Sequence, residues 1–345
     1  MIRRSLPCLL FALIVFSSFR RDHVTTIYMI GDSTMANKDI SGDKQERGWG
    51  MVLQGYFTDD IRIDNHAVNG RSSKSFIDEG RWQRIVDKLQ PGDYVFIQFG
   101  HNDEKAQPDR HTYPGSTFDA NLARFVNEAR AKKAIPVLFN AVVRRNFFRK
   151  DDSIDDESLR ATTFADLDEP INSDTLIDTH GLYIEAPRHV AHQLHVPFVD
   201  ANRITHDLEQ SLGVEGSRRL HMWFRPGEHP SVPQGRKDNT HYSVYGAHVV
   251  AGKLVDEIGR QVPALTHFIR HYDIVVAEDG SGHFFHLQEA VDLAAKGLIP
   301  SPSGHGLMKA GKKITILVAN GTYPKPIIPR SKNIVVEKRE GAVVE

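Results

Sequence analysis

Serine, histidine and aspartate side chains in separate segments of this chain could together carry out nucleophilic catalysis. Ser33 follows Gly31-Asp32 at the end of an apolar run, and Asp238-Asn-Thr-His241 lies far downstream. A serine becomes a nucleophile when a histidine takes its proton and an aspartate fixes the tautomer of that histidine. The spacing of one helical turn between Asp238 and His241 would allow such a contact. The alternatives are that Ser33 caps a helix and that Asp238 caps one near a surface histidine.

Two further segments could supply donors to an oxyanion. Gly70 lies in Asn65-His-Ala-Val-Asn-Gly-Arg71, and its backbone amide could approach a substrate closely. Asn102 lies in Gly100-His-Asn-Asp103, and a neutral side-chain amide is a suitable donor to a developing negative charge. For both residues, an ordinary role in a turn is the alternative.

The elements that must position these residues are strands and helices in alternation. Apolar strand-like runs are predicted at 24–30, 62–68, 94–99, 135–143 and 197–199, and helices at 75–89, 118–133, 182–195, 204–212 and 241–258. Alternation of this kind is typical of a parallel sheet covered on both faces, a three-layer α/β/α fold. Residues at the carboxyl ends of its strands should meet at one edge, where such sheets bind ligands. Residues 144–178 form a long polar loop.

Four blocks of this chain occur in the order typical of a known superfamily. They are Gly31-Asp32-Ser33, Gly70, Gly100-x-Asn102-Asp103 and Asp238-x-x-His241. In these blocks the chain resembles the SGNH (GDSL-type) hydrolases. Segments such as Asn69-Gly-Arg-Ser-Ser73 and Thr179-His-Gly-Leu-Tyr183 make it most similar to the rhamnogalacturonan acetylesterases within that superfamily, over about residues 24–262.

This resemblance implies a flavodoxin-like α/β/α hydrolase. It implies Ser33 as the nucleophile, His241 as the base and Asp238 as the residue that orients the base. It also implies an oxyanion hole made of the Ser33 amide, the Gly70 amide and the Asn102 side chain. The reaction would pass through an acetyl-enzyme on Ser33, without a cofactor.

The character of the chain changes after Pro263. Short β-runs at 272–277, 313–318 and 333–336 accompany one helical pattern at 287–295 and a Gly/Pro/Ser-rich segment at 297–311. Three strands and one helix cannot bury much apolar surface by themselves. We therefore expect this segment to be the start of a second domain. Ile274–Gly282, Leu287–Val291 and Val318–Tyr323 are similar to the opening of pectin methylesterases, which are right-handed parallel β-helices. This implies a truncated β-helix fragment at 270–345 without activity, and we expect the esterase to function without it.

The N-terminal residues predict export. Arg3 and Arg4 precede a short apolar run, which is typical of a signal peptide covering residues 1–22; an uncleaved anchor is the alternative, because no Ala-x-Ala site follows. Cys8 is the only cysteine, so the mature esterase domain (23–262) would have no disulfide and no thiolate chemistry. We expect a bacterial periplasmic or secreted protein, with no stable membrane span after cleavage.

Charge and composition bear on the partners. A net charge of −1 gives no field that favours nucleic acid. The resemblance implies an acetylated pectic polysaccharide as the partner, and we expect a monomer. Arg144 and Arg145 follow a strand end and could bind galacturonate carboxylates, although the aspartates after them favour a self-neutralising loop.

His189, His192 and His195 recur every third residue without a partner at metal-ligand spacing. A polar helix face is therefore favoured, and no metal is expected.

The favoured function is removal of acetyl groups from rhamnogalacturonan. A lysophospholipase or thioesterase would use the same chemistry but needs an apolar acyl tunnel, and no apolar lid-like helix adjoins the blocks. A carbohydrate-binding protein without activity is the alternative from another class. The intact Ser33, Asp238 and His241 argue against it.

Overall fold

A parallel sheet forms the centre of the protein in a computed structural model, which describes residues 23–148, 171–270, 274–298, 313–330 and 333–345. Within these ranges the sheet has five strands in the order β3-β1-β4-β5-β6. They are β1 (Thr25–Gly31), β3 (Ile61–Asn65), β4 (Tyr94–Gln98), β5 (Ile135–Phe139) and β6 (Phe198–Val199). The predicted parallel sheet is confirmed, and each predicted strand contributes to it.

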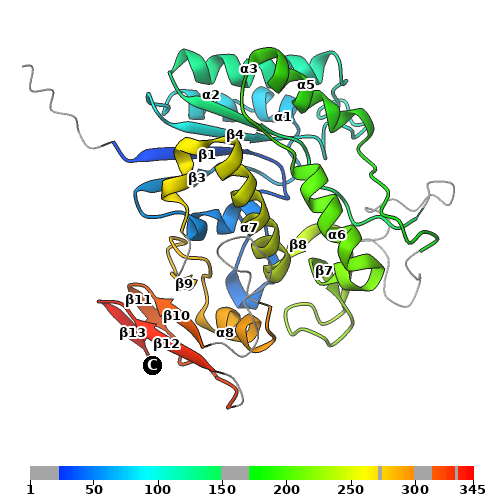
Figure 1. The fold of residues 1–345 in the computed structure, drawn as a ribbon. Helices are drawn as coiled ribbons and strands as arrows, with labels where there is room; N and C mark the ends of the chain where they lie inside the picture. Colours follow the sequence, from blue (N-terminus) through cyan, green and yellow to red (C-terminus); the bar gives the residue numbers. More distant parts are fainter. Residues whose placement is uncertain (1–22, 149–170, 271–273, 299–312, 331–332) are drawn as a thin grey trace, which may run out of the picture.

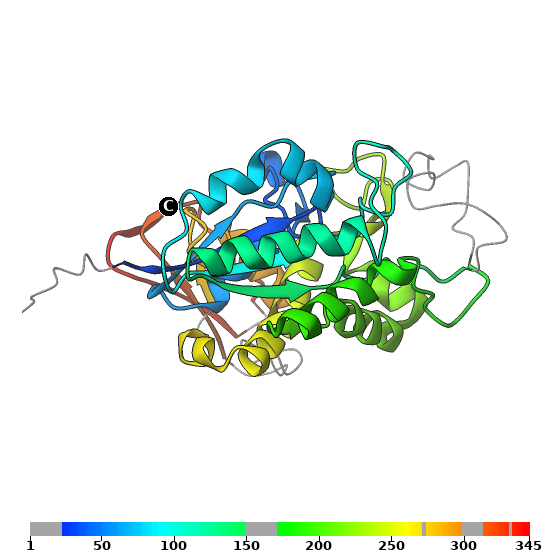
Figure 2. The same ribbon diagram turned by 90° about the horizontal axis from the view of Figure 1, so that it is seen from above.

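Helices cover both faces of this sheet (Figures 1 and 2). One face carries α1 (Ser73–Asp78), α2 (Arg81–Val86), α3 (Thr117–Ala131) and α5 (Glu185–Leu194). The other carries the 3₁₀ helices η2 (Trp49–Tyr56) and η5 (Pro263–Phe268), together with α7 (Val244–Gln261) and α6 (Ala201–Arg218). The side chains of β1 alternate between the two cores: Ile27 and Met29 pack toward η2 and α7, Tyr28 and Ile30 toward α2 and α3.

Several helices differ from their predicted bounds. The single helix predicted at 75–89 is two helices, because Gly80 adopts a left-handed φ of +67° between them. Helix α6 is longer than predicted and bends at Gly213. The final helix begins at Val244 and not at 241, because the Ser243 hydroxyl caps it by accepting from the amide of Gly246.

A small antiparallel sheet, which the sequence did not predict, lies beside the main one. It consists of β2 (Glu46–Arg47), β8 (Arg236–Ser243) and β7 (His221–Phe224), in the order β2-β8-β7. The polar run Arg236-Lys-Asp-Asn-Thr-His241 lacks apolar alternation, so nothing in it indicated a strand. This sheet places Asp238 and His241 on a strand and not at the start of a helix, which corrects that prediction.

The tail after residue 270 packs against the rest of the protein. Strands β9 (Ile274–Val276), β10 (Ile314–Val318) and β12 (Ile334–Lys338) pair in parallel, as do β11 (Gly321–Tyr323) and β13 (Ala342–Val344), and α8 spans Leu287–Ala295. Val276, Phe284 and Val291 share one buried cluster with Val244 and Tyr245 of α7. The tail therefore shares a core with α7 and is not a separate unit, and activity of the esterase without it stays a prediction.

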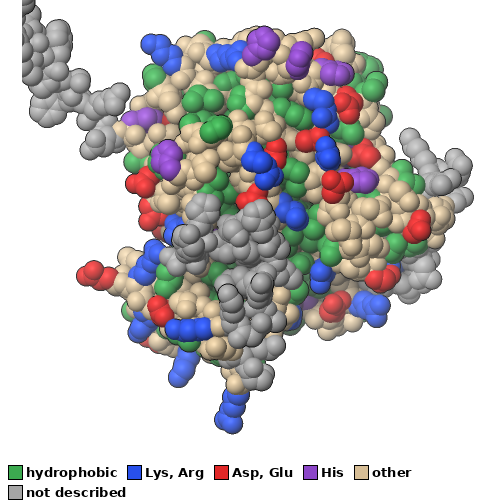
Figure 3. Space-filling view, viewed as in Figure 1, with side chains coloured by type: hydrophobic (Ala, Val, Ile, Leu, Met, Phe, Trp, Pro, Cys, Tyr) green, Lys and Arg blue, Asp and Glu red, His purple; other side chains and the backbone are tan. Residues whose placement is uncertain are grey.

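Some predicted features lie outside the described residues. These are the signal peptide at 1–22, which includes Cys8, and residues 149–170 of the long loop. Among the helices of the described ranges, none combines the length and apolar character that crossing a membrane would need. Lys/Arg and Asp/Glu side chains are intermixed on the face shown in Figure 3.

Candidate active site

Ser33 lies in a tight turn at the carboxyl end of β1. The Asp32 carboxylate accepts hydrogen bonds from the amide and the hydroxyl of Thr34, at 2.9 and 2.8 Å. Gly31 has no room for a side chain, because a Cβ would lie 2.7 Å from the carbonyl oxygen of Gln98. The close approach of β4 and the Asp32–Thr34 bonds together fix this turn at the sheet edge, and with it the position of Ser33.

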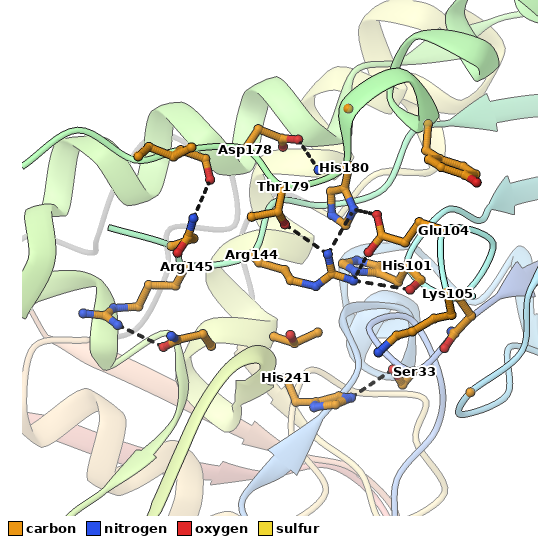
Figure 4. A pocket seen from close by; sticks show the side chains of 18 of the residues that line it. Ser33, His101, Glu104, Lys105, Arg144, Arg145, Asp178, Thr179, His180 and His241 are labelled. Atoms are coloured by element: carbon orange, nitrogen blue, oxygen red, sulfur yellow. Dashed lines mark hydrogen bonds and ion pairs between the residues drawn. The ribbon is translucent and has the colours of Figure 1, made fainter. Parts of the chain in front are cut away.

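A continuous row of hydrogen bonds joins Ser33 to His241 and Asp238 on β8; Figure 4 shows its first bond, between Ser33 and His241. His241 Nε2 lies 2.9 Å from Ser33 Oγ, and His241 Nδ1 lies 2.9 Å from Asp238 Oδ2. The other carboxylate oxygen of Asp238 accepts from the amides of Thr240 and His241, both at 2.9 Å. With its proton on Nδ1, the imidazole can accept the serine proton at Nε2. The structure thus brings together the three residues that the sequence singled out.

Gly70 and Asn102 both border the cavity that contains Ser33. Gly70 has a φ of +73°, a conformation in which a residue with a side chain is strained, so the turn after β3 requires glycine. The Asn102 side-chain amide donates to the carbonyl of Arg71 at 3.2 Å, which orients it beside that turn. Both residues thus border the same cavity as Ser33, and their role as oxyanion donors stays a prediction.

Asp103, next to Asn102, anchors the turn after β4 to helix α1. It is fully buried and accepts from the amide and hydroxyl of Ser73 and from the hydroxyl of Thr112. Burial raises the pKa of the Asp103 carboxyl to about 7. Its carboxylate contacts residues of the scaffold, whereas Asp238 contacts the imidazole of His241.

The two arginines predicted to bind substrate have different environments. Arg144 borders the cavity but forms an ion pair with Glu104 and donates to the Thr179 hydroxyl. Arg145 is fully buried, and its guanidinium donates to Ser217, Asn239 and the Val214 carbonyl. Arg145 also borders the cavity, but these partners hold its guanidinium and disfavour a contact with a sugar carboxylate, so that contact stays a prediction.

A polar cluster that the sequence did not single out lies across the cavity from Ser33 (Figure 4). His180 Nδ1 lies 2.9 Å from Glu104, and the rings of His180 and His101 meet edge to face at 4.5 Å. The pKa of His101 is well below its ordinary value, mainly because the ring is buried and also because His180 and Arg144 carry positive charge nearby. His180 belongs to the Thr179–Tyr183 segment noted for its resemblance, which was the one signal that pointed to this cluster.

The cavity has a volume of about 1250 Å³. Most of its lining side chains are polar or charged. They come mainly from the segments after β1, β3, β4 and β5, from β2 and β8, and from residues 177–183 around η4 (Gly181–Tyr183). Lys105 and Arg110 add positive charge to this lining. Exposed His189, His192 and His195 lie on or directly after α5, and the described residues contain no group of three or more ligands that could hold a metal.

Comparison with known proteins relates this arrangement to a family. A model of the GDSL-like Lipase/Acylhydrolase family matches residues 29–247. Rhamnogalacturonan acetylesterase RhgT of Bacillus subtilis (strain 168) is 39% identical over 231 residues, which cover 67% of this chain and 88% of RhgT. Probable rhamnogalacturonan acetylesterase YesY of the same strain is 29% identical over 240 residues, which cover 68% of this chain and 93% of YesY.

The fold also matches a solved structure. The crystal structure of YxiM from Bacillus subtilis matches with a TM-score of 0.53 at 23% sequence identity. The match covers 70% of this chain and 58% of YxiM. At this identity the likeness concerns the three-layer α/β/α fold alone.

Proposed function

The chain belongs to the GDSL-like Lipase/Acylhydrolase family and is an esterase, and we propose that it removes acetyl groups from rhamnogalacturonan. The observation that carries this proposal is the row of hydrogen bonds from Ser33 through His241 to Asp238 at the edge of a large cavity lined by many charged side chains. The cavity volume of about 1250 Å³ exceeds the range typical of small-molecule sites, about 300–1,000 Å³. A cavity of this size, with many charged and hydrogen-bonding residues in its lining, can hold several sugar units.

In the proposed reaction, His241 takes the proton of Ser33 while Ser33 Oγ attacks the acetyl carbonyl carbon. The resulting oxyanion is stabilised by the amides of Ser33 and Gly70 and by the Asn102 side chain. The bond to the sugar oxygen breaks as His241 returns the proton to that oxygen. Water, deprotonated by the same imidazole, then attacks the acetyl-enzyme and releases acetate.

Lys105 and Arg110 are the proposed contacts for galacturonate carboxylates. Both line the cavity, and the Lys105 ammonium points to the side of the cavity where Ser33 and His241 lie (Figure 4). Arg144 also lines the cavity, where it forms an ion pair with Glu104. Lys105→Gln should therefore raise KM for the polysaccharide and leave KM for a neutral aryl acetate unchanged.

Acetate release from acetylated rhamnogalacturonan tests the proposed substrate. The comparison substrates are acetylated xylan, 4-nitrophenyl acetate and a long-chain 4-nitrophenyl ester. We expect the highest kcat/KM on rhamnogalacturonan and no acetate release above background by Ser33→Ala. A preference for the long-chain ester would favour a lipase, and full activity of Ser33→Ala would refute the nucleophile.

We also propose that the tail resembles the first coils of a pectinesterase-like β-helix. The support for this is parallel pairing in two separate sheets, β9-β10-β12 and β11-β13. We assign it no activity, and its packing against α7 suggests a structural role.

We further propose that the protein is exported to the periplasm or the medium as a monomer, where pectic polysaccharide is accessible. The basic and apolar residues at the N-terminus support the export. Fractionation of expressing cells tests the location, and light scattering of the purified protein tests the monomer.

A further inference from the structure

A row of alternating charges runs from the wall of the cavity to the candidate triad. Lys38 Nζ lies 2.8 Å from Glu46 Oε1, and Arg236 Nη1 lies 2.8 Å from Glu46 Oε2. Arg236 Nη2 then lies 2.5 Å from Asp238 Oδ2. That oxygen also contacts His241 Nδ1 at 2.9 Å. Asp238 therefore divides a single carboxylate oxygen between a permanent cation and the imidazole.

We propose that Glu46 and Arg236 are positioning residues that act on the charge of His241 in opposite directions. Arg236 occupies Asp238 Oδ2 and adds a positive charge, so it opposes formation of the imidazolium. Glu46 neutralises Arg236 and adds a negative charge on the same side of the cavity, so it favours the imidazolium. This inference rests on the proposed role of His241 as the base.

The ionisation of Glu46 supports a direct interaction with the imidazole. Burial alone would raise the pKa of the Glu46 carboxyl, but the positive charges of His241, Lys38 and Arg236 outweigh burial and lower it to about 2. Coupling between two sites is reciprocal. If a charged His241 favours ionised Glu46, ionised Glu46 favours the charged imidazole by the same free energy.

Arg236 keeps its charge at every pH of interest. Burial opposes that charge, but Asp238 and Glu46 hold the pKa of the Arg236 guanidinium above its ordinary value. Its side chain is 31% exposed, whereas that of Asp238 is fully buried. The contact between them is therefore partly shielded from water.

Lys38 fixes the far end of the row. Its ammonium also donates to Asn69 Oδ1 at 2.7 Å, and Asn69 precedes Gly70. The same cation thus holds Glu46 in place and contacts the loop that carries a proposed oxyanion donor. Lys38 therefore connects the Glu46–Arg236 pair with the loop that contains Asn69 and Gly70.

Other titratable or charged groups also face His241 and must be taken into account. Asp32 and His101 interact with it electrostatically, and Lys105 borders the same cavity. Burial raises the pKa of Asp32 and lowers that of His101, so burial disfavours the charged form of each. The substitutions below leave all three unchanged, so their influence is the same in every variant.

The test is the pH dependence of kcat/KM for 4-nitrophenyl acetate in wild type, Glu46→Gln, Arg236→Gln and the double variant. Activity rises with pH as the imidazole loses its proton. We expect the midpoint to fall by about one pH unit in Glu46→Gln and to rise by about one in Arg236→Gln. In the double variant it should return close to the wild-type value. Shifts of both single variants in the same direction, or no shift in either, would overturn the inference.

Three controls separate this inference from folding and from the proposed function. Arg236→Lys keeps the positive charge, so the midpoint should stay at its wild-type value. Arg260→Gln removes the charge of an exposed α7 residue outside the cavity and should also leave the midpoint unchanged. The imidazole of His241 can also be titrated directly by NMR in the Ser33→Ala background, with its signal assigned from His241→Asn. This readout requires no catalysis: opposite shifts support the inference even if Ser33→Ala retains activity, an outcome that would refute only the proposed function.

Discussion

Glu289→Gln should destabilise the whole protein by about 3 kcal/mol, because it removes the charge that matches a buried arginine. The side chain of Arg47 is 1% exposed, and its guanidinium lies 2.6 Å from Glu289 Oε1. Loss of one partner of a buried ion pair costs about 3–5 kcal/mol. The lower figure applies here, because Arg47 keeps the backbone carbonyls of Lys44 and Glu46 as acceptors at 2.6 and 2.9 Å.

The protonation of the pair supports this size of effect. Burial raises the pKa of the Glu289 carboxyl and lowers that of the Arg47 guanidinium. Both shifts mean that the interior disfavours each charge, so each persists mainly because the other is present. The loss would remove a large part of a total stability of about 5–15 kcal/mol.

Urea unfolding followed by tryptophan fluorescence measures the change. With a slope of about 3 kcal/mol per molar, the unfolding midpoint of Glu289→Gln should fall by about 1 M. Glu257→Gln is the matched control, since Glu257 pairs with Arg260, whose side chain is 62% exposed, and should cost at most about 1 kcal/mol. Equal midpoints for the two variants would refute the reasoning, and the tail would then contribute little to the stability of the esterase.

Three further predictions concern catalysis, packing and acid stability. Asn102→Ala should lower kcat by about 10²–10³ with little change in KM, because an oxyanion donor acts mainly in the transition state; an effect on KM alone would instead make Asn102 a substrate contact. Gly246→Ala should cost about 3 kcal/mol or more in urea unfolding, because its Cβ would lie 1.8 Å from the Leu220 carbonyl oxygen. Gly216→Ala in α6, whose Cβ would meet only the Leu212 side chain at 3.4 Å, should be neutral or stabilising. The pKa of the Glu46 carboxyl is lowered from its ordinary value of 4.5 to about 2. Ionised Glu46 therefore stabilises the fold at pH values above 4.5, and this stabilisation is lost as the pH falls toward 2. Between pH 5 and pH 2, wild type should therefore lose up to about 3 kcal/mol more than Glu46→Gln, and equal losses would contradict the assignment.

The parallel sheet and the nucleophile turn could be predicted because their signals are local. The run Thr25–Ile30 is β-branched and apolar, and it is buried in the structure as such runs are. Gly31 then ends the run where the strand must pass close to β4. The blocks around Gly70 and Asn102 follow their strands directly, so topology alone brought them to the edge that holds Ser33.

The remaining features depend on contacts between residues far apart in sequence. Arg145 belongs to a charged run that resembles a solvated loop, yet its partners Ser217 and Asn239 lie 72 and 94 residues away and bury it. Glu46 carries no motif, and it enters the site only because β2 pairs with β8. The tail likewise gave no sign of its docking, which depends on contacts such as His283 with Tyr56 and Glu289 with Arg47.

The pairing of β2 with β8 also determines when the active site can form during synthesis. His241 follows Ser33 by 208 residues, which a ribosome translates in about 10–40 s at about 5–20 residues per second. During this interval β1 and β4 can pair and shape the nucleophile turn, but its base does not yet exist. The interval between the synthesis of Arg47 and that of its ion-pair partner Glu289 is longer, because 242 residues separate them. A nascent chain therefore contains the proposed nucleophile well before the proposed base, and the candidate site can be completed only after His241 has been synthesised.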